Sequence, residues 1–147
     1  HLDFRRQRQM CIRDSSITTD VIVGFPSEKE EDFENTIYAI NKSNLNNLHV
    51  FPYSVRPKTT AFYLKDHNSP EVIKSRSREL NKISKLITTK SMRNIIGKKR
   101  SILWEGKNMN SGLTEDYYRV IRKSVKLPNE YISKQKIKGL EKDKLYI

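Results

Sequence analysis

One segment constrains the fold of this chain more than any other, because it reads as a strand, a glycine turn and a helix in direct succession. Residues Ile17–Val23 form a short, largely β-branched run, which is typical of a buried parallel strand. Gly24-Phe25-Pro26 then interrupts the strand. Ser27 followed by Glu30 predicts a capping box, and the acidic residues between 28 and 32 favour a helix N-terminus through the helix dipole.

The segment that follows completes a strand–helix–strand unit. Phe33, Ile37 and Ile40 recur at helical spacing and predict one buried face, and the Asn- and Ser-rich stretch 41–47 ends the helix. Leu48–Phe51 is the next predicted strand, and the proline after it ends the strand. The two strands are therefore expected to be parallel, with a right-handed crossover.

A second helix and a set of short strands are predicted for the rest of the chain. Ser69 as N-cap and Pro70 at the first helical position start a helix that should run to about Asn94. After Gly97 the pattern changes to short β-like runs separated by turn residues, which predicts a small antiparallel barrel. The predicted strands are Arg100–Glu105, Tyr117–Arg122 and Tyr131–Ile137.

The charge of the chain points to an acidic partner. The formal net charge is +12, and residues 94–147 carry thirteen Lys or Arg against six Asp or Glu. Nucleic acid is the leading partner on this ground, and an anionic membrane surface is the weaker alternative. The plainer interpretation, a solvated Lys-rich surface, stays open.

Cysteine content and hydropathy limit the class of protein. The single cysteine, Cys11, allows no disulfide within the chain and favours an intracellular protein, and no apolar run reaches the roughly 18 residues of a membrane span. Residues 1–15 are polar, Arg-rich and aperiodic, and Met10–Ser15 reads like the translated end of a sequencing-library transposon. We expect this segment to be an assembly artefact; the alternative is a disordered or helical arm.

Two motifs carry candidate chemistry, and the topology predicts them at one sheet edge. The first spans Thr18–Glu28 and the second spans His49–Thr59. The carboxyl ends of parallel strands are where ligands bind in α/β folds. Gly24 would let a backbone approach a ligand, and the second motif offers an aromatic face, a hydroxyl and a guanidinium that suit a nucleotide. An ordinary βα turn and an ordinary surface loop are the plain alternatives.

The sequences of these two motifs resemble those of a known family. The stretches TTDVIVGFPSEKEEDF and LHVFPYSVRPKTTA are similar to the tRNA methylthiotransferase family of radical-SAM enzymes, and the His49–Ser54 wording is most similar to the branch that acts on threonylcarbamoyladenosine (t6A) at position 37 of tRNA. The segments around Gly97–Lys99 and Gly112–Val120 resemble the TRAM domain, a small RNA-binding barrel. The likeness covers roughly residues 16–147.

The resemblance implies an α/β fold with three parts. Residues 1–15 would be the artefact or arm, 16–94 the C-terminal part of a radical-SAM, TIM-like parallel barrel, and 95–147 a TRAM-like antiparallel β-barrel. It further implies a cytoplasmic enzyme that adds a methylthio group to C2 of t6A, with S-adenosylmethionine (SAM), two [4Fe–4S] clusters and an electron donor in the complete enzyme. Residues that would hold the SAM nucleoside are Asp20, Ile22, Val23, Gly24, Val50, Phe51, Pro52, Tyr53 and Arg56.

The same resemblance implies a tRNA anticodon stem-loop as partner. The residues expected to contact RNA are Lys98, Lys99, Arg100, Tyr117, Tyr118, Arg119, Arg122 and Lys123. Since alternate residues of a strand face opposite sides, at most one tyrosine of the Tyr117–Tyr118 pair should be free to stack on a base.

The chain also departs from the family pattern. Ser27 and Lys58 stand where the family has glycine; Ser27 is expected to be tolerated as a helix cap, and Lys58 to alter its loop. The family's cluster-binding cysteine triplet lies upstream and Cys11 does not match it, so the chain is expected to be an inactive fragment without catalytic or metal-binding residues. The alternatives are a non-catalytic RNA-binding module and a sibling enzyme acting on isopentenyladenosine or a ribosomal protein.

Overall fold

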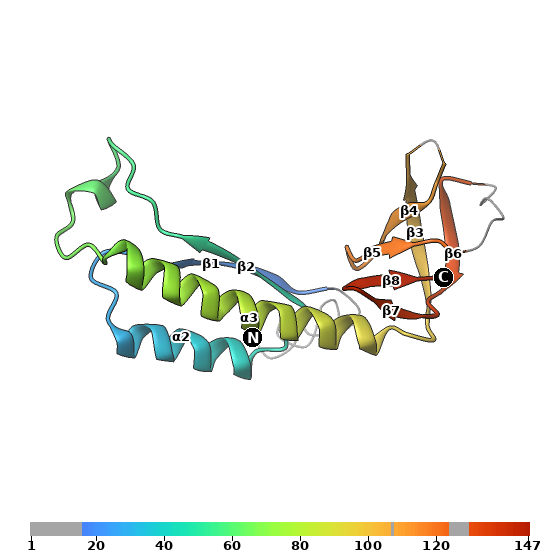
Figure 1. Cartoon of the computed structure of the whole chain (residues 1–147), viewed down its shortest axis with the longest axis horizontal. Helices are drawn as coiled ribbons and strands as arrows, with labels where there is room; N and C mark the ends of the chain where they lie inside the picture. Colours follow the sequence, from blue (N-terminus) through green and yellow to red (C-terminus); the bar gives the residue numbers. More distant parts are fainter. Residues whose placement is uncertain (1–15, 107, 124–129) are drawn as a thin grey trace, which may run out of the picture. The chain divides into compact units, whose positions relative to one another are not determined.

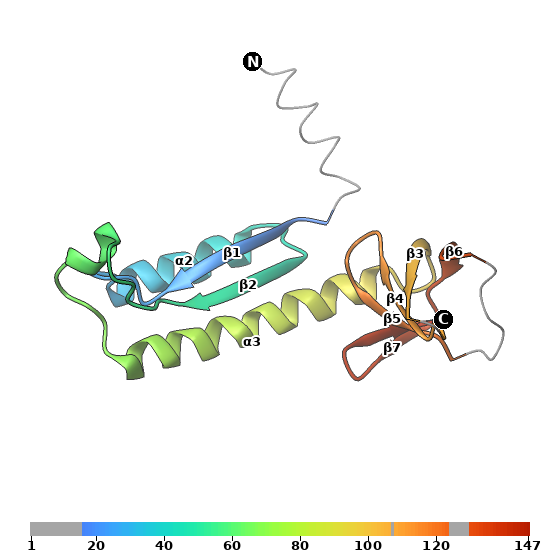
Figure 2. The same cartoon turned by 90° about the horizontal axis from the view of Figure 1, so that it is seen from above.

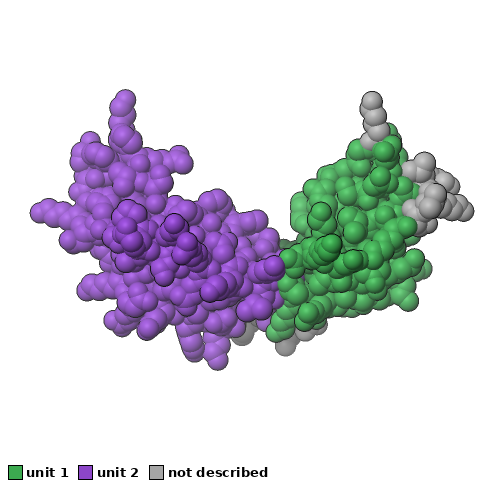
Figure 3. Space-filling view, in the orientation of Figure 1, with its two compact units in different colours: residues 1–16, 89–147 green, residues 17–88 purple. Residues whose placement is uncertain are grey.

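The computed structural model describes residues 16–106, 108–123 and 130–147 (Figure 1). The chain divides into two compact units, which are numbered here in chain order: the first unit is residues 17–88, purple in Figure 3, and the second unit is residues 89–147, green in Figure 3. The segment 1–15, on which the artefact prediction falls, lies outside the described residues.

The first unit contains the predicted strand–helix–strand unit. Strand β1 (Thr18–Val23) and strand β2 (Asn47–Pro52) pair in parallel, and helix α2 (Glu30–Lys42) connects them. A short 3-10 helix, η1 (Thr60–Tyr63), lies in the loop before the long helix α3 (Pro70–Asn94). The predicted parallel pairing and the predicted extent of α3 are both confirmed.

Helices α2 and α3 cover the same face of the β1–β2 sheet (Figures 1 and 2). The apolar core between them is built from one side chain of each strand and three of the helices, packed against half-buried neighbours. Its buried members are Val23, Phe33, Ile40, Leu48 and Leu80. The first strand was expected to be buried, but the described residues cover only one side of the sheet, so that Ile22 is 56% and Phe51 50% exposed.

Helix α2 begins two residues later than predicted, with Lys29 rather than Ser27 as its N-cap. The capping box of Ser27 with Glu30 is wrong: Ser27 has a left-handed backbone (φ 66°), and its N–H donates to the carbonyl of Asp66 (2.9 Å). The helix starts at Glu30, after Lys29, whose N–H donates to the carboxylate of Asp32 (2.9 Å). The acidic first turn is present, but the carboxylate that accepts from the N–H of the cap residue belongs to Asp32 rather than Glu30.

Helix α3 starts as the sequence predicts. Ser69 Oγ accepts a hydrogen bond from the N–H of Val72 (3.4 Å), and Pro70 occupies the first helical position. A hydrogen bond from the backbone N–H of Glu71 to its own carboxylate lowers the pKa of Glu71, and a hydrogen bond from the Ser69 side chain lowers it further.

The second unit is a six-stranded sheet in the order β6-β3-β4-β5-β8-β7. Its core contains Met92, Ile95, Ile102, Trp104, Tyr118, Val120, Ile137 and Leu145. The strands are β3 (Lys99–Glu105), β4 (Ser111–Thr114), β5 (Arg119–Ile121), β6 (Ile132–Lys136), β7 (Gly139–Glu141) and β8 (Lys144–Tyr146).

This sheet differs from the closed antiparallel barrel that the turn spacing predicted. Four neighbouring pairs are antiparallel, but β5 and β8 are parallel, and within the described ranges no pair joins β6 to β7 to close the sheet. A parallel pair needs a long connection, and here that connection contains β6 and β7. A small β-domain is present; its closure into a barrel, and that of residues 16–94 into a larger barrel, stay predictions.

Candidate functional site

The two sequence motifs meet at the carboxyl ends of β1 and β2. Ile22 lies opposite Phe51 and Val23 opposite Pro52, and the N–H of Tyr53 donates to the carbonyl of Val23 (2.8 Å). The parallel register therefore brings the glycine turn and the aromatic loop to one sheet edge, where the sequence predicted them.

The predicted nucleoside-binding residues divide between the two faces of this sheet. Asp20, Ile22 and Phe51 are exposed and lie on the face opposite the helices. Val23 and Val50 point into the core with α2 and α3, so only their backbone atoms can reach a ligand on the open face. The open face offers two apolar side chains that lie opposite each other, with a carboxylate two residues along.

Gly24 is explained by packing inside the protein. Its φ of 75° is a left-handed conformation that glycine tolerates best, and a Cβ built at this position would overlap Ile73 Cγ1 of α3. The N–H of Gly24 also donates to Glu28 Oε2 (2.8 Å). Glycine is thus required by the close approach of α3, whereas the sequence had suggested the approach of a ligand.

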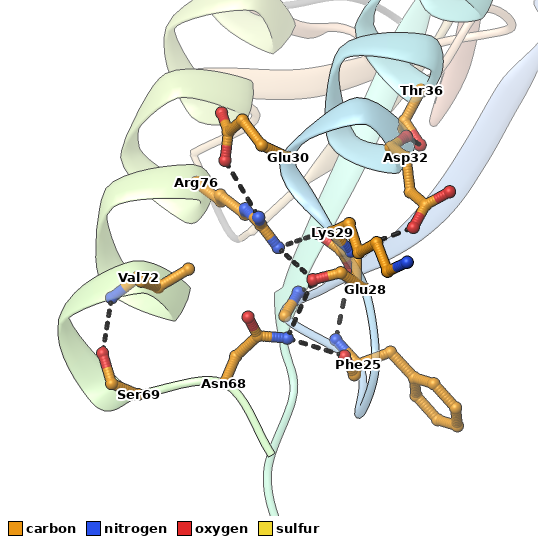
Figure 4. Close-up of polar contacts among 11 residues, drawn as sticks. Phe25, Glu28, Lys29, Glu30, Asp32, Thr36, Asn68, Ser69, Val72 and Arg76 are labelled. Carbon is orange, nitrogen blue, oxygen red and sulfur yellow. Dashed lines mark hydrogen bonds and ion pairs between the residues drawn. The ribbon is translucent and has the colours of Figure 1, made fainter. Parts of the chain in front are cut away.

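A buried ion pair holds this turn against α3 (Figure 4). Arg76 Nη1 donates to Glu28 Oε1 (2.8 Å), and its Nη2 donates to Glu30 Oε2 (2.9 Å). Arg76 also donates to the carbonyl of Glu28, and Asn68 Nδ2 donates to the carbonyl of Phe25 (2.8 Å). From the sequence, Glu28 and Glu30 were expected to have a role only at the start of the helix, and no role at this site was predicted for Arg76 or Asn68.

The aromatic loop after β2 is anchored by Tyr53. Its ring packs edge-to-face on Phe25 (centroids 5.3 Å apart), and its hydroxyl donates to the carbonyl of Ala61 (3.3 Å). The exposed Arg56 contributes its carbonyl oxygen, which accepts from Thr59 Oγ1 (2.8 Å). Lys58 adopts a left-handed backbone (φ 66°), as Ser27 does.

Most of the predicted RNA-contacting cations in the second unit already have partners. Arg100 Nε donates to Asp116 Oδ2 (2.6 Å), Arg119 pairs with Glu105, and Lys123 pairs with Glu141. The hydrogen bond to Glu141 raises the pKa of Lys123. Arg122 Nη2 donates to Asn110 Oδ1 (2.9 Å).

Lys98 and Lys99 are exposed, so the predicted cations are not equally available to a phosphate.

The two adjacent tyrosines lie in opposite environments. Tyr118 is 5% exposed and belongs to the core, whereas Tyr117 is 83% exposed. Tyr117 lies in a turn with a left-handed φ of 62°, and its N–H donates to the carbonyl of Thr114 (2.8 Å). Only Tyr117 is therefore placed to stack on a base, in line with the expectation that at most one of the pair is free.

The exposed face of β3 and β6 adds two cations that the sequence analysis did not assign to RNA, Lys134 and Lys136. Lys99 lies directly opposite Lys136, and Ser101 lies opposite Lys134. Exposed Leu103 and Ile132 form the next cross-strand pair. Alternation along Ile132–Lys136 would have placed both lysines on one face, but the pairing partner of that strand is not readable from sequence.

The described residues hold no cluster of three or more His, Cys, Asp or Glu side chains that would bind a metal ion. The lone cysteine, Cys11, lies outside the described part, and one thiolate does not supply the three that a [4Fe–4S] cluster needs. These residues do not fit such a cluster. The described helices include none that is both long and apolar enough to cross a membrane.

Comparison with known proteins gives a consistent set of relatives, although no family model matches the chain. The tRNA-2-methylthio-N(6)-dimethylallyladenosine synthase of Hydrogenobaculum sp. (strain Y04AAS1) is 36% identical over 68% of this chain and 23% of its own length. Proteins of the same name from Caldicellulosiruptor saccharolyticus and Bacillus subtilis (strain 168) are 36% and 33% identical over 84% and 76% of the chain.

The chain spans about a quarter of the length of these relatives, between 22% and 26%. Their name supports the similarity to tRNA methylthiotransferases. It specifies dimethylallyladenosine as the modified base of those proteins, and so does not support the threonylcarbamoyladenosine branch that the His49–Ser54 wording suggested.

Proposed function

We propose that this chain is part of a tRNA methylthiotransferase, in which residues 16–94 belong to the catalytic barrel and residues 95–147 form a TRAM-like RNA-binding domain. The observation that carries the proposal is the similarity to the named synthases over 68% to 84% of the chain. The meeting of the two motifs at one sheet edge adds support, because that is where α/β folds bind ligands.

The substrate that the relatives favour is tRNA carrying N6-dimethylallyladenosine. The threonylcarbamoyladenosine substrate is a second candidate, which rests on the His-Val-Phe-Pro-Tyr-Ser wording of residues 49–54. Both place the anticodon stem-loop of tRNA in contact with the protein in the cytoplasm. Methylthio transfer to a ribosomal protein is less well supported, since the relatives are named for tRNA.

The open face of the β1–β2 sheet is the proposed place for the SAM nucleoside. Ile22 and Phe51 offer adjoining exposed apolar surface for an adenine, and Asp20 offers a carboxylate on the same face. In the family, SAM and two iron–sulfur clusters supply the radical chemistry and an electron donor reduces the clusters. Described residues here would only bind and orient the nucleoside.

The second unit is the proposed RNA-binding part. Exposed Tyr117 supplies a stacking surface, and Lys98, Lys99, Lys134 and Lys136 supply cations that the sheet leaves exposed. Arg100 and Arg119 each have a carboxylate partner, so we assign them a supporting role.

Nucleoside analysis tests the proposal directly. The complete gene that contains this chain is expressed in a bacterium from which the endogenous methylthiotransferases have been deleted, and its tRNA is digested and analysed by mass spectrometry. Appearance of 2-methylthio-N6-dimethylallyladenosine is the expected result, and the 2-methylthio form of t6A would select the second candidate.

If no methylthio nucleoside appears while the chain still binds tRNA, the enzyme assignment is wrong and a non-catalytic RNA-binding module becomes the function. The basic outer face of the second unit favours that alternative over any protein-directed one.

A further inference from the structure

The first unit contains a groove that the proposed SAM face does not use. It lies between the end of β2 and the helix α3 and has a volume of about 810 Å³. Figure 2 shows α3 running alongside β2. The apolar part of its lining consists of Pro52, Tyr53, Val55, Pro70 and Ile73.

The wall of the groove formed by α3 is basic. Lys74, Arg78, Lys82 and Lys85 recur at intervals of four, four and three residues, so they lie along one stripe of the helix. At 1.5 Å per residue the stripe is roughly 16 Å long. Ser77 and Asn81 lie between these cations, and the lining contains no carboxylate.

The partners of these cations differ from those of the buried Arg76. Lys74, Arg78 and Lys82 are exposed and make no ion pair with any residue in the described ranges. Arg76, on the neighbouring stripe, pairs through its two Nη groups with Glu28 and Glu30. Helix α3 thus separates one arginine that holds the fold together from a row of cations that face solvent.

We infer that this groove binds a single-stranded segment of RNA, with phosphates along Lys74, Arg78, Lys82 and Lys85 and a base against Tyr53 and Val55. A cationic wall beside an aromatic and apolar wall is the arrangement by which proteins bind single strands without reading sequence. The choice of RNA rests on the proposed function, and the inference deepens it by adding a contact surface in the first unit.

Two features favour RNA over an acidic peptide that would add a strand to β2. Pro52 closes the strand at the groove and has no N–H to donate to an added strand. The cations lie on the helix, at the opposite wall from the strand edge, where phosphates of a strand stacked on Tyr53 would reach them.

The first experiment measures binding of a fluorescein-labelled oligouridylate to the 147-residue chain by anisotropy at several salt concentrations. The variant K74E/R78E/K82E is expected to bind at least tenfold more weakly at low salt. Its salt slope is expected to fall by about 2, since each phosphate contact on a single strand contributes roughly 0.7. Circular dichroism confirms that the variant stays folded.

The matched control is K29E/K42E/K65E, which makes the same charge change at exposed lysines outside the groove. Equal weakening by both triples would show a general charge effect and overturn the inference, as would unchanged binding in the groove triple. If the groove triple weakened binding of poly-glutamate but not of oligouridylate, the groove would bind an acidic peptide, and the inference would be overturned too.

A second pair of variants tests the apolar wall. Val55→Glu is expected to weaken oligouridylate binding about tenfold, whereas Leu86→Glu, an exposed apolar residue of α3 outside the groove, should leave it unchanged. Equal affinities for the two would contradict base contact at Val55. If no methylthio nucleoside appears in the tRNA but the groove variants still weaken oligouridylate binding, the proposed enzyme activity is wrong and the inferred RNA-binding groove is supported.

Discussion

Arg76 and Glu28 form an ion pair in which both side chains are largely buried, 6% and 15% exposed, and the pair joins α3 to the turn that follows β1. Glu28 uses one carboxylate oxygen for Arg76 and the other for the N–H groups of Gly24 and Phe25. The turn at the mouth of the sheet is therefore held by a helix that begins more than forty residues later in the chain.

Arg76→Met should destabilise the first unit by about 3–5 kcal/mol, because it leaves a buried carboxylate without its cation. Glu28→Gln should cost about 2 kcal/mol, through loss of charge-assisted hydrogen bonds. Thermal and urea unfolding followed by helix ellipticity measures both.

Glu30→Gln is the matched control, because Glu30 contacts the same guanidinium but its side chain is 70% exposed. It should cost less than about 1 kcal/mol, as exposed pairs do. Equal costs for the two glutamates would mean that burial does not distinguish them.

Gly24→Ala should destabilise the protein by about 2–4 kcal/mol, from left-handed strain together with overlap on Ile73. Gly97→Ala separates the two causes: Gly97 has a φ of 83° but nothing within 4 Å of an added Cβ. It should cost only about 1–2 kcal/mol.

A double-mutant cycle of Gly24→Ala with Ile73→Ala should show a coupling of about 1 kcal/mol, since removing the Ile73 side chain relieves the overlap. Additive effects would contradict the packing explanation of this glycine.

The first unit was predictable from sequence because its signals are local. The β-branched run before Gly24, the i, i+4, i+7 face of α2 and the Ser69-Pro70 start of α3 each specify an element without reference to distant residues. The start of α2 was misplaced because Ser27 is held outside the helix by Asp66, a contact between residues 39 positions apart. No local pattern encodes that bond.

The second unit was less predictable, for physical reasons of the same kind. Its strands are three to seven residues long, too short for a clear period, and β4, β7 and β8 were missed. The parallel pairing of β5 with β8 depends on tertiary packing alone. In the candidate site, residue type identified the sheet edge, but which side chains face α3 depended on where the helices pack.

Ser27→Gly and Lys58→Gly should each stabilise the protein by about 0.5–1 kcal/mol. Both residues adopt a φ of 66°, where a side chain costs about 1–2 kcal/mol. Glycine removes that strain but raises the entropy of the unfolded chain, which offsets part of the stabilisation. These are the two positions at which the chain departs from a glycine of the family pattern. Ser54→Gly, at a residue without positive φ, should instead cost about 0.5 kcal/mol.

Lys136→Glu should stabilise the second unit by about 0.2–1 kcal/mol, because it converts a directly opposed like-charge pair with Lys99 into an ion pair. It should also weaken RNA binding and lower the salt slope by about 1. The double variant K99E/K136E places two like charges opposite each other again and should lose the gain in stability. If the two lysines bind RNA, Lys136→Glu should raise the stability and lower the affinity for RNA.

Tyr117→Ala should weaken RNA binding by about 1–3 kcal/mol, because the base loses the ring on which it stacks. The melting temperature should not change, since the exposed ring adds no packing to the core. Tyr63→Ala removes another exposed ring, in the first unit, and should leave affinity unchanged. Equal losses in the two variants would remove Tyr117 from the proposed interface.

The burial of Trp104 gives the molecule an internal spectroscopic label. It is the single tryptophan of the sequence, it lies in the second unit, and its indole N–H donates to Ser133 Oγ (2.7 Å). Its emission therefore reports only on the sheet core, whereas far-ultraviolet ellipticity is dominated by α2 and most of α3 in the first unit. One sample heated once, and read in both channels, distinguishes a chain whose units melt independently from one that melts as a single body.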